Sequence, residues 1–161
     1  MSEQGVRLLR TADAQILELI ELFSGRDDGV LTEPCPARAK LADGTIGAVA
    51  WHTAENYRRI ARFVSDQPDG GHPNARSASD ITLSALGRLL VSGRDALQSL
   101  GDLSEERLNA VPPAGAMRFC DGRRTLQGVL AGLLTHQANN VQALKIAVES
   151  SAAQSPSSCR A

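Results

Sequence analysis

Apolar residues recur every three or four positions in four long segments of the chain, with polar residues between them. These segments run from Val6 to Phe23, from Thr45 to Val64, from Ile81 to Leu97 and from Leu126 to Val148. This spacing is typical of amphipathic helices that bury one face. No run of alternating apolar and polar residues indicates a β-strand. The pattern therefore predicts an all-α fold, a four-helix bundle.

Residues that commonly cap the first turn of a helix mark three of the helix starts. Thr45 opens the second segment, and Thr125 precedes the fourth. The stretch Ser77-Ala78-Ser79-Asp80 resembles a capping box and predicts the start of the third helix. Long connections lie before and after the second helix, at residues 26–44 and 66–78. Connections of this length could cross the bundle rather than form tight hairpins.

The end of the chain differs in composition from the helical part. From Ser150 onward the residues are mainly Ser, Ala, Gln and Pro, which bury too little apolar surface to offset the cost of ordering. We therefore expect one helical domain over residues 1–149 and a disordered tail over residues 150–161. Before the fourth helix, the stretch from Met117 to Cys120 is expected to be extended.

Composition and charge argue against several classes of partner. The formal net charge is -1 and aromatic residues make up 3% of the chain, so neither a basic surface nor base-stacking platforms indicate nucleic acid. No apolar run approaches the roughly 20 residues that a membrane-spanning helix needs. The first ten residues also lack the apolar core of a signal peptide. We expect a cytoplasmic protein without membrane association.

Two short stretches of the chain echo each other, and each holds a histidine followed four residues later by an asparagine. The pairs are His52 with Asn56 and His136 with Asn140. A spacing of four places both side chains on one face of a helix, one turn apart. Both pairs border the apolar stripe of their helix. Imidazoles and amides gathered inside a bundle either bind a ligand or satisfy one another's hydrogen bonds.

Other polar residues of the same helices have simpler explanations. Arg58, Arg59 and Arg62 are expected to form a solvated face of the second helix. Asn139 falls outside the face shared by His136 and Asn140. The functional hypothesis therefore requires that imidazoles from distant parts of the chain converge on one cavity that water can enter.

Two motifs resemble those of the DinB-like proteins. One is Gly47-Ala48-Val49-Ala50-Trp51-His52 near the start of the second helix, and the other runs from Asp121 to Gln127 and leads into Leu134-Thr135-His136. The resemblance implies a four-helix bundle with long connections between its helices. Many members of that family are regarded as metalloenzymes. The family includes isomerases and S-transferases that use a low-molecular-weight thiol, mycothiol or bacillithiol.

The resemblance also implies a metal site, but one in which a ligand is replaced. His52 matches the family's first histidine ligand, and His136 matches the first member of a later His-x-x-x-His pair. Asn140 occupies the position of the second member. An amide oxygen is a poor ligand for zinc or nickel compared with imidazole. Asn140 or Glu55 would have to complete the coordination of a divalent ion.

These features lead to two hypotheses of different class. The first is a DinB-like enzyme that acts on a small-molecule electrophile or carbonyl compound, as a transferase, isomerase or cyclase. His52 and His136 would be metal ligands or, without metal, general acid and base, and Asn56 and Asn140 would orient them or hold the substrate. The second is a non-catalytic bundle that binds a small molecule or forms a dimer, with the His-Asn pairs as a buried structural network. The family resemblance also implies a homodimer.

Overall fold

The computed structural model describes residues 2–67 and 76–154 of the 161-residue chain. In these ranges the backbone forms helices and turns and no strand, apart from an isolated antiparallel bridge between Pro34 and Thr45. The α-helices are α1 (Glu3–Phe23), α2 (Ile46–Val64), α3 (Leu83–Gln98), α4 (Glu105–Asn109) and α5 (Leu126–Gln154). Single 3₁₀ turns, η1 (Asp28–Thr32), η2 (Pro36–Arg38) and η3 (Ala78–Asp80), lie in the connections. The all-α prediction is confirmed.

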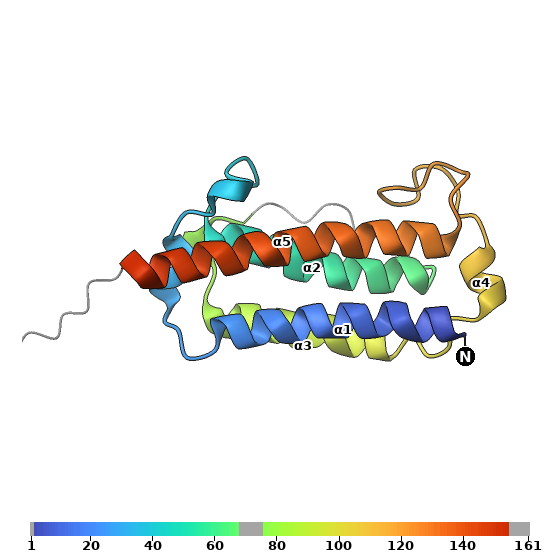
Figure 1. The fold of residues 1–161 in the computed structure, drawn as a ribbon, viewed down its shortest axis with the longest axis horizontal. Coiled ribbons are helices and arrows are strands. Elements are labelled where there is room, and N and C mark those ends of the chain that lie inside the picture. The colour runs from blue at the N-terminus through green and yellow to red at the C-terminus, as the bar shows by residue number, and fades with distance from the viewer. Residues whose placement is uncertain (1, 68–75, 155–161) are drawn as a thin grey trace, which may run out of the picture.

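The four long helices lie side by side as a bundle (Figure 1). Helix α2 packs against α3 and α5, and α1 packs against the same two helices, so α1 and α2 occupy opposite corners. Helices α1 and α5 run in one direction, and α2 and α3 run in the other (Figure 1). The connection from α1 to α2 therefore stays at one end of the bundle. The connection from α2 to α3 joins opposite ends, so only this second link crosses as predicted.

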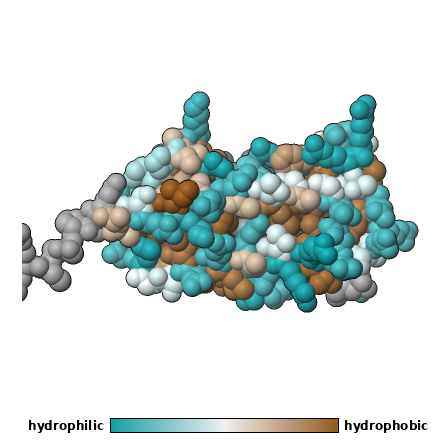
Figure 2. All heavy atoms as spheres, viewed as in Figure 1, coloured by the Kyte–Doolittle hydropathy of each residue, from teal (hydrophilic) through white to brown (hydrophobic). Residues whose placement is uncertain are grey.

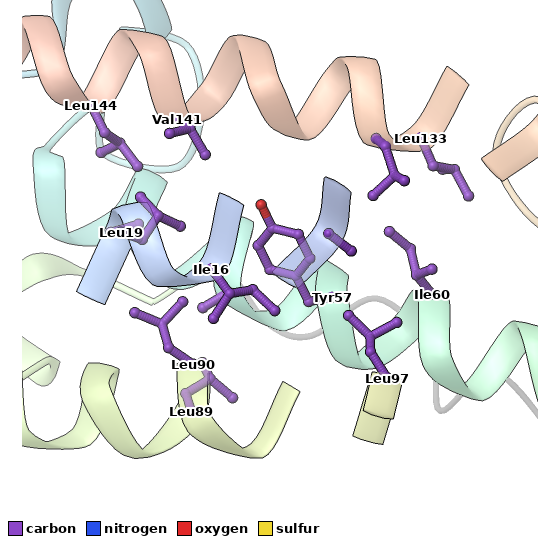
Figure 3. Packing of buried hydrophobic residues seen from close by; sticks show 14 of the residues in the cluster. Ile16, Leu19, Tyr57, Ile60, Leu89, Leu90, Leu97, Leu133, Val141 and Leu144 are labelled. Atoms are coloured by element: carbon purple, nitrogen blue, oxygen red, sulfur yellow. The ribbon is translucent and has the colours of Figure 1, made fainter. Parts of the chain in front are cut away.

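The core is formed by the apolar stripe of each long helix. The labelled side chains in Figure 3 come from α1, α2, α3 and α5 and meet in the middle of the bundle. Tyr57 is the largest fully buried side chain, with 0% exposure. Its hydroxyl donates to Gln15 Oε1 at 2.9 Å, and Gln15 Nε2 donates to the Leu134 carbonyl at 3.0 Å. A hydrogen-bonded chain thus links three helices within an apolar core.

Two of the predicted helix caps are present, and the third lies elsewhere. Thr45 accepts from the Ala48 backbone N–H, and Thr125 accepts from that of Gly128. Helix α3, by contrast, begins at Leu83 with Thr82 as its N-cap. The predicted start at Ser77 is wrong because residues 78–80 form a 3₁₀ turn. The Asp43 carboxylate accepts from the Ser77 hydroxyl and the Ala78 N–H, a tertiary contact that the local sequence does not reveal.

Two other local predictions are corrected. Helix α5 continues to Gln154, so the segment 150–154 is helical rather than disordered, and residues 155–161 lie outside the described part of the chain. The reason is that this segment contains neither glycine nor proline, and the first proline beyond the helix is Pro156. The stretch from Met117 to Cys120 forms turns rather than an extended strand, with the Cys120 N–H donating to the Met117 carbonyl at 3.0 Å.

Hydrophilic residues dominate the face seen in Figure 2 and separate its small hydrophobic patches. The largest exposed apolar side chains are Leu17, Val91, Val111 and Ile146. They come from different elements, and scattered residues of this kind are normal on a folded protein. Among the described helices, none combines the length and apolar character needed to cross a bilayer.

Candidate functional site

A cavity of about 400 Å³ lies between α2, α5 and the connection that precedes α5. Helix α2 contributes four lining residues, the connection contributes four and helix α5 contributes three. The lining consists of His52, Asn56, Arg59, Ile60, Gly115, Ala116, Met117, Arg118, Leu133, His136 and Gln137. The volume lies within the range of roughly 300–1,000 Å³ that is usual for small-molecule sites.

Three of the residues predicted for the site meet in this cavity. His52 and Asn56 come from α2, and His136 comes from α5. Because α2 and α5 pack together in opposite directions, residues 84 positions apart in sequence line the same space. Both histidine side chains are partly exposed, so solvent reaches this part of the bundle. Asn140 and Glu55 are not among the lining residues.

Gln137 holds the inner wall of the cavity in a fixed conformation. Its side chain is 1% exposed. Its Nε2 donates to the Thr53 carbonyl at 2.7 Å, and its Oε1 accepts from Asn56 Nδ2 at 3.1 Å. The two hydrogen bonds join α5 to α2 directly beside the two histidines. Asn56 is therefore oriented by another amide, and its Nδ2 group is committed to the helix interface.

Arg118 contacts the imidazole of His136. Its Nη1 lies 3.2 Å from His136 Nε2. A guanidinium can only donate hydrogen bonds, so Nε2 must be the acceptor in this contact. The neutral imidazole then carries its proton on Nδ1. The geometry thus selects one tautomer, with a basic nitrogen at Nε2 that Arg118 covers.

The turn before α5 holds Arg118 in this position. Phe119 adopts a left-handed backbone conformation with φ 70°, which reverses the chain at this point. The Phe119 ring lies against Gly132, where a Cβ atom would be 3.4 Å from the ring. The Arg118 guanidinium stacks over the same ring, 5.2 Å from its centre. Gly132, which lies one turn before His136 on α5, therefore leaves room for the Phe119 ring that supports Arg118.

The surroundings of His136 keep its imidazole neutral. Burial lowers the pKa of His136 below its ordinary value, and the positive charges of Arg118 and Arg38 lower this pKa further. At neutral pH the ring is therefore a proton acceptor. A second group with an altered pKa is Tyr57, whose pKa is raised by burial, so its hydroxyl remains a hydrogen-bond donor.

The lowered pKa of His136 predicts that acidification destabilises the fold. Between pH 7 and pH 5 the unfolded chain binds a proton at His136 more readily than the folded chain does, so the free energy of unfolding decreases as pH falls. Urea denaturation at pH 8, 7, 6 and 5 measures this decrease. The variant His136→Gln should lose less stability over the same interval. Parallel curves for the two proteins would contradict the assignment.

Asn140 takes part in a different arrangement from the one predicted. Its side chain is 1% exposed, and its Oδ1 accepts from Arg38 Nε at 2.8 Å. Its Nδ2 is buried and has no hydrogen-bond partner among the described residues. The η2 turn carries Arg38 from the long connection before α2 to the surface of α5. Asn140 therefore holds the Arg38 guanidinium near His136 and does not line the cavity itself.

The donor groups present do not fit the divalent metal that the family resemblance implied. In the described ranges, no three His, Cys, Asp or Glu side chains lie where they could hold an ion. The amide oxygen of Asn140 already accepts from a guanidinium, and Glu55 pairs with Arg58 at 3.7 Å. Arg118 places a positive charge beside His136 Nε2. This environment disfavours a cation. His72, the third histidine, lies outside the described residues.

Sequence reasoning missed the positive charges of the site. Arg59 was expected on a solvated face, but it is partly buried and lines the cavity. Arg118 lies in a stretch that was expected to be extended and had no predicted role. Gln137 also had no predicted role. A signal for Gln137 was available, since it falls on the buried stripe of its helix between Leu133 and Val141, where a polar residue requires a partner.

Comparison with known proteins finds no family whose pattern matches this chain, and no curated protein or solved structure matches it either.

Proposed function

We propose that the protein is an enzyme that moves protons on a small carbonyl compound bound in the cavity between α2 and α5. One observation carries this proposal: His52 and His136, far apart in sequence, line a single cavity that solvent can reach. Paired imidazoles suit general acid–base chemistry because the ordinary pKa of an imidazole lies near neutrality. The reaction class is an isomerisation or a cyclisation through an enol.

The two histidines take different roles. His136 Nε2 is the unprotonated nitrogen of the ring, and once Arg118 no longer donates to it, it accepts the proton from the carbon next to the carbonyl group. The electron pair of that C–H bond moves into a carbon–carbon double bond, and the carbonyl oxygen receives a proton from His52. Return of both protons, one of them to a different carbon or to the other face, completes an isomerisation. No oxidant or reductant is needed.

The rest of the cavity supports a small organic substrate. Ile60, Met117 and Leu133 provide apolar surface for its hydrocarbon part. Asn56 presents a side-chain amide whose orientation is fixed by Gln137. The oxygen of a rigid amide beside the imidazoles can accept a hydrogen bond from a hydroxyl group of the substrate without reorganising during the reaction.

Proton exchange tests this function with simple carbonyl compounds in place of the natural substrate. A panel of small ketones and 2-oxo acids is incubated with the protein in D₂O, with and without 2-mercaptoethanol as a thiol, and NMR follows deuterium incorporation next to the carbonyl group. We expect exchange above the uncatalysed rate for at least one compound, and its loss in the double variant His52→Asn/His136→Asn. Asn139→Ala is the matched control, because Asn139 is exposed on the same helix.

The alternative of a non-catalytic bundle makes a different prediction in this assay. A binding protein would use the same cavity to hold a compound without labelling it. Exchange absent across the panel, or equal in the wild type and the double variant, would favour that alternative over the enzyme.

A further inference from the structure

Among the described residues, the charged groups that line the cavity are all of one sign. Arg59 and Arg118 line it, and no lining residue in the described part of the chain is acidic. Arg38 adds a third positive charge close enough to lower the pKa of His136. The chain as a whole has a formal net charge of -1, so this concentration of arginine is local.

Two of these arginines approach the cavity without a carboxylate partner. Arg38 donates to the neutral Asn140 Oδ1 and to the Ala37 carbonyl. Arg118 donates to the neutral imidazole of His136 and stacks on Phe119. Among the residues that the structure describes, neither forms an ion pair with Asp or Glu. Arginines elsewhere, such as Arg94 with Asp13, do have such partners.

We propose that the cavity binds the anionic oxygen group of its substrate, a carboxylate or a phosphate, and that Arg118 is the residue that binds it. The planar guanidinium presents paired N–H donors that match two oxygens of either group. Arg59, on α2, adds positive charge to the same cavity. This inference rests on the proposed function for its site and names the class of substrate.

Binding of the anion also uncovers the base. In the free protein, an Arg118 N–H occupies the electron pair of His136 Nε2 at 3.2 Å. A charged oxygen is a stronger acceptor for a guanidinium than a neutral imidazole nitrogen is. The anion therefore draws Arg118 away from His136, and Nε2 becomes available to accept a proton. Substrates with the anionic group would activate the site, and neutral analogues would leave the base covered. Arg118 is in this sense both a binding and a positioning residue.

Titration of the His136 ring by NMR tests this proposal. Arg118 and Arg38 are the charged groups that act on this ring, and Arg59 and His52 line the same cavity. The wild type, Arg118→Gln and the control Arg123→Gln are titrated with propionate, with inorganic phosphate and with chloride at the same ionic strength. Arg123 is an exposed arginine of the same connection and is not a lining residue.

We expect propionate or phosphate to shift the His136 resonance and to raise the pKa of His136 in the wild type and in Arg123→Gln. Arg118→Gln should start with a higher pKa for His136 and show no response to either anion. A response to propionate identifies a carboxylate site, and a response to phosphate alone identifies a phosphate site. No response to either probe, or the same response to chloride, would overturn the proposal, as would a response that persists in Arg118→Gln.

This titration is independent of turnover. If the wild type catalyses exchange of neutral ketones but ignores both anions, only the inference about the substrate class is wrong. If the anions bind through Arg118 but no compound undergoes exchange, the proposed acid–base function is wrong.

Discussion

Substituting asparagine for His136 should lower the rate of deuterium exchange by about 10²–10⁴-fold, the usual contribution of a general base. Asparagine keeps a polar side chain, but its amide does not accept a proton at neutral pH. The partial exposure of His136 makes the substitution compatible with folding. Initial rates with the best compound of the panel, measured at pH 8 to exclude protonation of the base, give this effect. A decrease of less than tenfold would remove His136 from the base role.

The pH profile separates the base from the acid. Because the pKa of His136 is lowered, its neutral form persists under mildly acidic conditions, and the acidic limb of the wild-type rate should lie below pH 6.5. His52→Asn should reduce the rate and leave this limb in place. Asn139→Ala should preserve both the rate and the profile. If the acidic limb disappears in His52→Asn, His52 is the base and His136 is the acid.

The backbone pattern could be read from the sequence wherever one helix face is buried. Within the segment predicted from Thr45 to Val64, the apolar residues spaced by three or four positions, such as Ile46, Val49 and Ile60, are buried. Capping followed the same logic at Thr45 and Thr125, where the hydroxyl satisfies a local N–H group. These features depend on neighbours three or four positions away, which a single sequence displays directly.

The site required contacts that sequence spacing does not contain. The two histidines share a cavity because α2 and α5 pack in opposite directions. A predicted four-helix bundle is compatible with this arrangement but does not specify which helices are neighbours or their directions. Arg118 reaches His136 because Phe119 has a left-handed backbone and because Gly132, fourteen positions after Arg118, leaves room for the Phe119 ring. Neither residue indicates a charged contact in the sequence. At Ser77, where α3 was predicted to start, the chain contacts Asp43, which lies more than thirty residues away. Tertiary partners of this kind override local preference.

The two initial explanations of the His-Asn pairs apply to different residues. Asn56 joins a hydrogen-bonded network with Gln137 across the helix interface, as a structural explanation requires. The histidines instead face a cavity open to solvent, as a functional explanation requires. Asn140 neither hydrogen-bonds Gln137 nor lines the cavity, because its side chain accepts from Arg38. A low-molecular-weight thiol stays a prediction from the family resemblance, and the exchange assay includes a thiol for that reason.

Replacing Gln137 by alanine should destabilise the protein by about 2–4 kcal/mol, the combined cost of a cavity and of a partly buried amide that loses its partner. Gln137 is 1% exposed, and its loss removes the hydrogen bonds to the Thr53 carbonyl and to Asn56 Nδ2. The Thr53 carbonyl lies inside a helix, so the cost comes mainly from Asn56 and from the lost packing between α2 and α5. Urea denaturation at pH 7.5 measures the change in the free energy of unfolding.

Gln142→Ala is the matched control for this prediction. Gln142 lies on the same helix but is exposed, so its substitution should change the free energy of unfolding by less than about 0.5 kcal/mol. The double variant Asn56→Ala/Gln137→Ala should be less destabilised than the sum of its single changes, because one hydrogen bond joins the two amides. Strict additivity, or a cost for Gln137→Ala as small as that for Gln142→Ala, would show that the hydrogen bond between Asn56 and Gln137 does not hold the inner wall of the cavity.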